Sequence, residues 1–422
     1  MHMKKRSGIR KFSLITAISV LLICLTGAFI ALGINRAFDR GGLGGVSGGS
    51  QNDKYAAADA PSLPSTEEYE KIFVLKAGMT NAEKAALWDK AVAVTTGKVL
   101  FVMEDDWVAD NTGIHDFGTT TAVDSEGVHL GSLLVPAGVD MTLDMRGHKI
   151  DRRLTDWLTG NDNWQGEVIK VKGKLTLTGN GVITGGYNDA QGGGINITAS
   201  GTLTMYSGTI KGNTAAYGGG IGLSNGATVI MYGGLITENI ADDTCDISMG
   251  GGVSLANGAV FEMYGGQISK NTSRQGGGVA IRAPISPYTN NINNIVDPGT
   301  GDPSTFKMYG GIIGGDTAAD GNVTTAVSSA NVNNGAGGGT GVLAMMRSKF
   351  EMYGGKISNN KANGTYQGSG VKATIGSSFT MNGGTISSNV NAYCGGGGVL
   401  IAINSKFVLL DGIIENNRAD VP

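Results

Sequence analysis

Apolar and polar residues alternate in short runs through the second half of the chain. In residues 250–266, Val253 and Leu255 flank a serine, and Phe261 and Met263 flank a glutamate. Alternation with a period of two over three or four residues is typical of short strands with one buried face. Glycines and Asn-Gly pairs separate these runs, as expected of turns that need a positive φ. The pattern therefore predicts short β-strands joined by tight corners.

These runs belong to a 17-residue block that recurs six times without an internal gap. The copies are residues 192–208, 218–234, 250–266, 339–355, 368–384 and 396–412. A seventh copy, residues 276–311, matches at both ends but is 36 residues long, which is 19 more than the others. Recurrence of this kind indicates a solenoid, in which each repeat packs only against its neighbours.

Each repeat contains three predicted strands, of the form Gly-Gly-Val-x-Leu, Phe-x-Met-Tyr and Gly-x-Ile-Ser. A single repeat buries little by itself, whereas stacked copies place Phe on Phe, Met on Met and Ile on Ile. Equivalent strands of successive repeats then pair in parallel. We therefore predict an all-β fold over residues 126–422, a right-handed parallel β-helix solenoid of about nine turns.

An asparagine follows each repeat at a fixed distance, five residues after the last glycine of the block. We expect it to form an internal ladder at one corner, where its side-chain amide satisfies the backbone groups of the turn. The ladder residues are Asn213, Asn239, Asn271, Asn360, Asn389 and Asn417. In the interrupted copy the same position holds Asp316, so the ladder is predicted to break there.

Residues 1–35 combine a basic stub with an uncharged apolar stretch. Residues 12–34 contain no charged side chain, and five positive charges precede them. A stretch of this length can span a bilayer, and the preceding charges favour the cytoplasmic side for the N-terminus. We expect a single-pass membrane anchor with the remainder outside the cell. The alternative is a cleaved signal peptide and a secreted protein.

Two segments connect this stretch to the solenoid. Residues 36–66 are rich in Gly, Ser and Pro and are expected to be a flexible linker. Residues 67–125 are expected to cap the first turn, because a solenoid needs a terminal unit over its edge. A capping-box pattern begins at Thr80 and predicts a helix to about Val94. A strand over Val99–Met103 is predicted to follow it.

Composition and net charge limit the classes of binding partner. The 71 glycines fall at fixed corners of the repeats, so they indicate repetitive β-structure rather than disorder. The first 40 residues hold seven of the 32 basic and one of the 35 acidic groups, which leaves 25 basic and 34 acidic groups, a net charge of −9. An acidic balance of this size argues against nucleic acid as a partner.

The sequence offers few residues for catalysis. None of the four histidines lies in the repeats, which removes most catalytic triads and metal-histidine sites from the solenoid. Residues 222–226 match Gly-x-Ser-x-Gly, but Ser224 aligns with an alanine and a threonine in other copies. Glu262, Lys307 and Glu351 occupy one outward position in successive turns and are expected to pair across strands. No catalytic residue and no cofactor is predicted.

A column of tyrosines is the best candidate for binding. Five successive turns carry tyrosine next to the outward face, namely Tyr206, Tyr232, Tyr264, Tyr309 and Tyr353. Stacked aromatic rings are one way to build a platform for sugars. They also stabilise neighbouring strands without any ligand. Both interpretations remain open from the sequence.

Clustered aspartates give a weaker candidate. One corner of neighbouring turns carries Asp242, Asp243, Asp246, Asp316 and Asp320. Carboxylate oxygens are the ligands that Ca²⁺ prefers, so calcium binding is one interpretation and a solvated acidic loop is the other.

Two long insertions interrupt the regular solenoid at two corners of one turn. They cover residues 281–303 and 315–337 and are rich in Asn, Thr, Ser and Gly. Loops of this length are uncommon unless they are functional or disordered. Because they flank Tyr309, we expect either a binding role beside the tyrosines or a pair of tolerated mobile insertions.

The repeat unit, clearest in Gly250–Asn271 and Gly368–Asn389, resembles the right-handed β-helix repeats of bacterial surface proteins. It is similar to polymorphic outer-membrane-protein repeats, with their Gly-Gly-Ala-aliphatic and Phe-x-x-Asn signatures, and more distantly to pectate-lyase-like folds. The first resemblance implies adhesion or surface display, and the second implies polysaccharide cleavage. We expect a non-catalytic adhesin or display rod that contacts glycans or a neighbouring cell surface. The alternative is an enzyme or a binding protein for polysaccharides.

Overall fold

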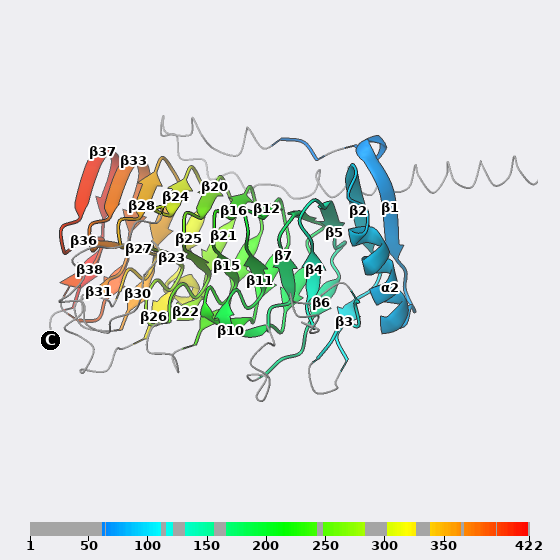
Figure 1. Ribbon diagram of the computed structural model, residues 1–422. Coiled ribbons are helices and arrows are strands. Elements are labelled where there is room, and N and C mark those ends of the chain that lie inside the picture. Colours follow the sequence, from blue (N-terminus) through cyan, green and yellow to red (C-terminus); the bar gives the residue numbers. More distant parts are fainter. Residues whose placement is uncertain are drawn as a thin grey trace, which may run out of the picture. The chain divides into compact units, whose positions relative to one another are not determined.

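The computed structural model describes residues 61–63, 65–110, 115–120, 131–155, 166–242, 248–282, 302–325, 338–363, 367–393 and 395–420. The chain divides into two compact units, residues 1–50 with 63–69 and residues 51–62 with 70–422. The described part of the first unit contains the short 3-10 helix Thr66–Glu68. The described part of the second unit is built almost entirely from strands (Figure 1).

The largest sheet among the described residues has 19 strands, two for most turns of the chain. They are β1 (Tyr69–Leu75), β2 (Lys98–Met103), β3 (Trp107–Val108), β5 (Asp140–Asp144), β6 (Lys149–Asp151), β8 (Lys174–Thr178), β9 (Val182–Thr184), β12 (Thr202–Met205), β13 (Thr209–Lys211), β16 (Thr228–Met231), β17 (Leu235–Thr237), β20 (Val260–Met263), β21 (Gln267–Ser269), β24 (Thr305–Met308), β25 (Ile312–Gly314), β28 (Lys349–Met352), β29 (Lys356–Ser358), β33 (Ser378–Ser387) and β37 (Lys406–Glu415).

Two further long sheets contribute the other sides of each turn. The nine-stranded sheet contains β4 (Leu133–Val135), β7 (Ile169–Val171), β11 (Ile195–Ile197), β15 (Ile221–Leu223), β19 (Val253–Leu255), β23 (Val279–Arg282), β27 (Val342–Met345), β32 (Val371–Thr374) and β36 (Val399–Ile401). The eight-stranded sheet contains β10 (Tyr187–Gln191), β14 (Thr214–Tyr217), β18 (Ile240–Ala241), β22 (Thr272–Ser273), β26 (Val323–Thr324), β30 (Lys361–Ala362), β34 (Val390–Asn391) and β38 (Arg418–Ala419). A small two-stranded sheet pairs β31 (Gln367–Gly368) with β35 (Gly395–Gly396).

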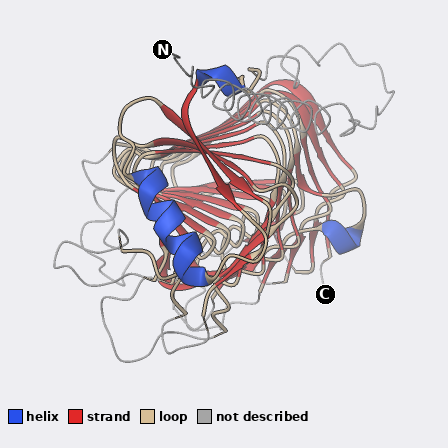
Figure 2. Ribbon diagram, turned by 90° about the vertical axis from the view of Figure 1, so that its right-hand side faces the viewer, coloured by secondary structure: helices blue, strands red, loops and turns tan. Residues whose placement is uncertain are grey.

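Successive repeats pair in parallel and in register. Phe261 lies opposite Phe306, and Met263 lies opposite Met308. The same parallel register continues from β24 to β28 and from β28 to β33. The predicted all-β solenoid with parallel sheets is therefore confirmed. Figure 2 looks along the solenoid from the end that carries the helix, and the strands are seen on the sides of one continuous winding.

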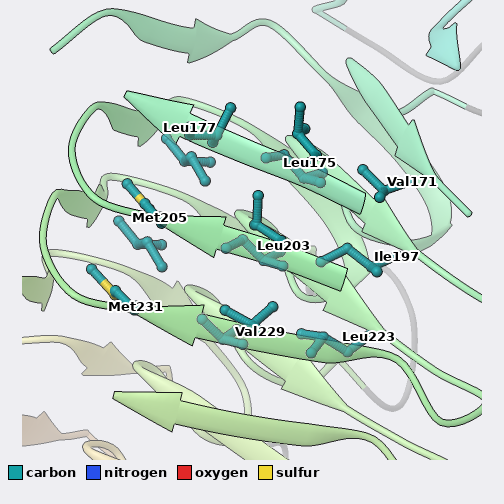
Figure 3. Packing of buried hydrophobic residues seen from close by; sticks show 14 of the residues in the cluster. Val171, Leu175, Leu177, Ile197, Leu203, Met205, Leu223, Val229 and Met231 are labelled. Carbon is teal, nitrogen blue, oxygen red and sulfur yellow. The ribbon is translucent and has the colours of Figure 1, made fainter. Parts of the chain in front are cut away.

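The apolar positions of the repeat fill the interior. In three neighbouring turns, Leu175, Leu203 and Val229 point the same way from β8, β12 and β16 (Figure 3). They are no more than 1% exposed. In later turns the same position holds phenylalanine, and the rings of Phe261, Phe306, Phe350, Phe379 and Phe407 stack with centroids 4.8–5.0 Å apart. Burial of these columns is the main stabilising contribution, because one turn alone leaves its inner face uncovered.

The asparagine ladder runs through the interrupted turn, so the predicted break at Asp316 is wrong. Asn322 occupies the ladder position there: its Oδ1 accepts from Nδ2 of Asn271 at 3.0 Å, and its own Nδ2 donates to Oδ1 of Asn360 at 2.9 Å. Asn271 lies three positions after Ile268, whereas Asn322 lies nine positions after Ile313. The interrupted turn therefore has six additional residues between the isoleucine and the ladder asparagine. The insertion therefore bulges outward and leaves the buried hydrogen bonds continuous.

Helix α2 (Asn81–Val92) covers the first turn of the solenoid. Thr80 and Glu83 form the predicted capping box, and the helix ends two residues earlier than expected. Trp88 is fully buried, donates from its indole nitrogen to the carbonyl of Leu134 at 3.0 Å, and packs edge-on against Phe101. Ala85, Trp88 and Val92 are buried on the side of the helix that covers the core.

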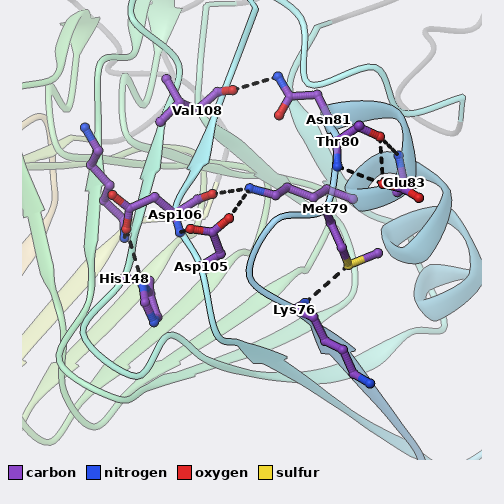
Figure 4. A network of polar contacts seen from close by, with 11 residues as sticks. Lys76, Met79, Thr80, Asn81, Glu83, Asp105, Asp106, Val108 and His148 are labelled. Atoms are coloured by element: carbon purple, nitrogen blue, oxygen red, sulfur yellow. Dashed lines mark hydrogen bonds and ion pairs between the residues drawn. The ribbon is translucent and has the colours of Figure 1, made fainter.

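Polar contacts attach this helix to the turn beneath it (Figure 4). The ammonium of Lys84, which is almost buried, lies 3.0 Å from a carboxylate oxygen of Asp105 and also donates to the carbonyl of Asp106. The hydrogen bond from Lys84 holds the pKa of Asp105 below its usual range. Asn81 donates to the carbonyl of Val108 at 2.9 Å. These contacts connect α2 to β3 and to the corner that joins β2 to β3.

The sequence pattern did not predict β1, whereas the predicted strand Val99–Met103 is present as β2. Strand β1 pairs with β2, and β2 pairs in parallel with β5. Parallel pairing therefore begins within the segment 67–125 that was expected to serve only as the cap. The predicted anchor, residues 12–34, lies outside the described residues, and so does most of the predicted linker. None of the helices that the structure describes is long and apolar enough to cross a membrane.

Candidate functional site

The five tyrosines form one continuous stack on the outside of the 19-stranded sheet. Adjacent rings have their centroids 5.1, 5.1, 4.7 and 4.9 Å apart, in the order Tyr206, Tyr232, Tyr264, Tyr309 and Tyr353. Planes of neighbouring rings differ by 13–26°. We call this set the tyrosine stack. Each ring is half-buried.

Glycine makes this spacing possible. Four of the five tyrosines, all except Tyr206, are followed directly by a glycine where the chain turns into the next strand. At Gly233, a Cβ atom would lie 2.4 Å from the carbonyl oxygen of Tyr206 in the preceding turn, and Gly265 stands in the same relation to Tyr232. A side chain there would push the turns apart, because contacts this short are forbidden for carbon. The Tyr-Gly pair of the repeat is therefore required by the close approach of successive turns.

Stacking determines which parts of the rings a ligand can reach. The faces of the three inner rings are covered by their neighbours, so only their edges and hydroxyl groups remain toward solvent. The hydroxyl of Tyr264 donates to Glu262 at 3.3 Å, and that of Tyr353 donates to Glu351 at 3.1 Å. Burial and then the charge of Glu262 raise the pKa of Tyr264 to about 12. This phenol is therefore a neutral hydrogen-bond donor at physiological pH.

A column of alternating charges runs beside the stack. The Lys307 ammonium lies 3.1 Å from a carboxylate oxygen of Glu262, and Glu351 is the residue opposite Lys307 in the next turn. The hydrogen bond to Glu262 raises the pKa of Lys307 above its usual value. Together with the tyrosine hydroxyls, these three side chains form a polar strip parallel to the rings. The predicted cross-strand pairing between Glu262 and Lys307 is confirmed.

The candidate calcium ligands do not converge among the residues that the structure describes. Asp242 is nearly buried and accepts a hydrogen bond from the hydroxyl of Tyr187 at 2.7 Å. Asp316 pairs with Lys356 at 3.1 Å, and Asp320 pairs with Lys270 at 3.4 Å. Asp243 and Asp246 lie outside the described residues. Within the described ranges there is no group of three or more His, Cys, Asp or Glu side chains suited to a metal ion.

The insertion at 315–337 is only partly a loop. Its first residues form a short 3-10 helix, Ala318–Asp320, in which Thr317 and Asp320 cap each other. The chain then returns to the solenoid through β26, which pairs in parallel with β22 and β30. Residues 326–337, and residues 283–301 of the other insertion, lie outside the described residues. The described bulge is anchored to the turns on both sides by the two ion pairs of Asp316 and Asp320.

A buried polar cluster near the first turns was missed in the sequence. Arg152 and Glu167 are fully buried, and Arg152 donates to the carbonyl of Glu167. Asn188 donates to a carboxylate oxygen of Glu167 at 2.9 Å, and the Lys170 ammonium lies 3.9 Å from the other oxygen. Burial lowers the pKa of Arg152 to about 10 and raises that of Glu167. These residues precede the clean repeats, so no internal comparison could single them out.

No protein family, curated protein or solved structure matches the chain.

Proposed function

We propose that the chain is a non-catalytic β-solenoid that acts as an adhesin or display rod on a bacterial cell surface. The observation that carries this proposal is the use of the repeated residues. Phe, Met and Ile stack in the interior, Asn forms the internal ladder, and Gly permits the close approach of turns. Each recurrent residue thus helps to hold successive turns together. This is expected of a scaffold protein whose function depends on its length.

The location belongs to the same proposal. The uncharged residues 12–34 with their preceding positive charges support a single-pass anchor, with residues 36–66 as a spacer and the solenoid outside the cell. Cleavage of the same segment would give a secreted protein. We propose a right-handed winding of about nine turns, because strand–crossover–strand connections in parallel sheets have that hand almost without exception.

A second candidate function is binding of a linear polysaccharide along the tyrosine stack. The specific observation in its favour is the strip made by five ring edges and the Glu262–Lys307–Glu351 column. Tyrosine hydroxyl groups repeat there once per turn, as the hydroxyl groups of a sugar chain repeat once per unit. Contact would come from ring edges and hydroxyl groups, because neighbouring rings occupy the inner faces. Only the outer faces of Tyr206 and Tyr353 are not covered by another tyrosine.

One assay separates the scaffold, the glycan-binding protein and the enzyme. The full-length protein is displayed on a non-adherent bacterium, and adhesion to immobilised polysaccharides and to host cells is measured. The soluble products are analysed for unsaturated or reducing sugar ends. We expect adhesion without turnover. Sustained release of such ends would overturn the non-catalytic proposal, and loss of adhesion in Tyr232→Phe and Tyr264→Phe, which keep the rings, would assign binding to the hydroxyl groups.

A further inference from the structure

Three side chains of the buried polar cluster in the early turns bring together an amine, a carboxyl group and a carboxamide. Lys170 lies in β7, Asn188 lies in β10, and Glu167 precedes β7 by two residues. Glu167 and Asn188 are 0% exposed, and Lys170 is 8% exposed. One carboxylate oxygen of Glu167 accepts from Nδ2 of Asn188 at 2.9 Å, and the other lies 3.9 Å from Nζ of Lys170. The amine and the carboxamide therefore share one buried carboxyl group.

Burial favours the neutral forms of the amine and the acid. An ion pair that leaves water loses the hydration of both charges, and burial raises the pKa of Glu167. Transfer of one proton from the ammonium to the carboxylate gives a neutral amine, which is a nucleophile, beside a carboxylic acid, which is a proton donor. The carboxamide is polarised as well, because Oδ1 of Asn188 accepts from the backbone N–H of Ala190 at 2.9 Å.

We propose that Lys170 and Asn188 form an intramolecular isopeptide bond, with Glu167 as the group that transfers the protons. The Nζ atom of Lys170 attacks Cγ of Asn188, a new C–N bond forms, and the bond between Cγ and Nδ2 breaks. Glu167 donates a proton to the leaving nitrogen and takes one from the attacking nitrogen, so ammonia departs and the carboxyl group is regenerated. No atom is oxidised or reduced, and no co-reactant is needed. Burial keeps water from competing with the amine.

The bond would hold together a part of the solenoid that the asparagine ladder does not reach. Gly186 lies three positions after Ile183, and in the next turn Asn213 lies three positions after Ile210. The N–H of Gly186 donates to Oδ1 of Asn213 at 3.0 Å, but glycine has no amide side chain to continue the ladder to the turn before. Among the described strands of the eight-stranded sheet, β10 pairs with β14 alone. A covalent link to β7 would secure this end of the sheet.

Mass spectrometry of the full-length protein tests the bond directly. After proteolytic digestion, we expect a branched peptide that contains both Lys170 and Asn188 and is lighter by one ammonia than the sum of its two linear parts. Succinimides also form with loss of ammonia, at Asn-Gly sequences such as Asn225-Gly226. Treatment with hydroxylamine before digestion is the control, because it opens succinimides and leaves an isopeptide bond intact. A protein that yields only the linear peptides would overturn the proposal.

Three variants assign the roles within the cluster. Lys170→Arg keeps the positive charge without the reactive amine and should give no branched peptide. Glu167→Gln keeps the shape of the side chain without the acid, so the yield of branched peptide should fall at least about tenfold. Lys172→Arg, two residues along the chain, is the matched control and should form the bond in full. An undiminished yield in Glu167→Gln would overturn the role of the acid. A link from Lys170 to Asn196, the carboxamide opposite it in β11, would overturn the assignment to Asn188.

Discussion

The interior phenylalanine stack and the exterior tyrosine stack have nearly the same geometry in different surroundings. Phenylalanine centroids are 4.8–5.0 Å apart and tyrosine centroids are 4.7–5.1 Å apart, because both spacings follow the distance between paired strands. The interior rings of Phe261, Phe306, Phe350 and Phe379 are 0% exposed, whereas the tyrosine rings are half-buried. Stacking by itself therefore reveals periodicity and says nothing about function.

The difference between the two stacks lies in what a substitution would remove. A buried phenylalanine is surrounded by other apolar side chains, so its loss leaves a cavity that neighbours fill only partly. An exterior tyrosine has solvent along its edge, so water can fill the space that its ring leaves when it is substituted. We therefore expect a graded series of effects on stability from the interior to the outer face.

Phe350→Ala should give the largest loss of stability. The ring lies between Phe306 at 5.0 Å and Phe379 at 4.8 Å, and both neighbours would border the cavity. We expect the free energy of unfolding to fall by about 3–5 kcal/mol, measured by denaturant titration with circular dichroism. Ser224→Ala, which removes one hydroxyl between strands, should change it by less than about 0.5 kcal/mol. Equal effects of the two variants would contradict the inward assignment of the phenylalanines.

Asn322→Ala tests whether the ladder is continuous through the interrupted turn. The substitution leaves the carbonyl of Ile268 and the backbone N–H of Asn271 without their partners, both in a buried region. An unsatisfied buried group costs about 1–3 kcal/mol, so unfolding should become easier by at least that amount. Asn225→Gly is the control, because Asn225 is exposed and its φ of 57° suits glycine. Equal stability of the two variants would show that the ladder contributes nothing there.

The ladder also shows where the sequence pattern is a reliable guide and where it is not. A fixed offset placed Asp316 at the ladder position, because six extra residues at an outer corner cannot be seen when repeats are aligned by spacing. The residues that follow the asparagine identify the ladder position better than its distance from the glycine does. Asn322, like Asn239 and Asn271, is followed by one residue and then a small side chain in a buried strand position. Burial constrains this local motif, whereas the corner length is free to vary.

Parts of the chain without internal copies were harder to predict. Helix α2 was found because Thr80 and Glu83 form a local capping signal, and the strands were found because seven copies agree. Strand β1 has neither signal, since it alternates poorly and pairs only at one end of the solenoid. The buried polar cluster around Glu167 was not predicted for the same reason. Comparison among repeats is informative only where the same environment recurs.

Lys372 is an exception to the contrast between buried interior residues and solvent-exposed outer residues. It lies in β32 between the core residues Val371 and Ala373 and therefore faces away from the core. Its partners in the neighbouring strands are Leu343 and Leu400, and it is only 1% exposed. Burial lowers its pKa to about 8 from an ordinary value of 10.5. Between these two values the unfolded chain binds more protons than the folded one, so stability rises with pH through this window.

The variant Lys372→Met should remove that pH dependence. Below about pH 8 the buried ammonium disfavours folding, so the variant should be more stable there by roughly 1–3 kcal/mol. Above about pH 10.5 the two proteins should converge, because lysine is neutral in both states. Denaturant titrations across this range for both proteins give the comparison. Lys349→Met, at an exposed position, should run parallel to the unsubstituted protein.

Tyr264→Ala should cost less stability than Phe350→Ala and is the sharpest probe of the outer stack. It removes ring contacts with Tyr232 at 5.1 Å and Tyr309 at 4.7 Å, each pair being worth about 0.5–1.5 kcal/mol beyond burial. Tyr264→Phe keeps both contacts and loses one half-exposed hydrogen bond to Glu262, so it should cost less than about 0.5 kcal/mol. Paired unfolding and glycan-adhesion measurements then separate the two roles of the stack. A Phe variant that keeps its stability but loses adhesion would show that the hydroxyl groups bind a ligand, whereas unchanged adhesion in both variants would leave the tyrosines a purely structural column.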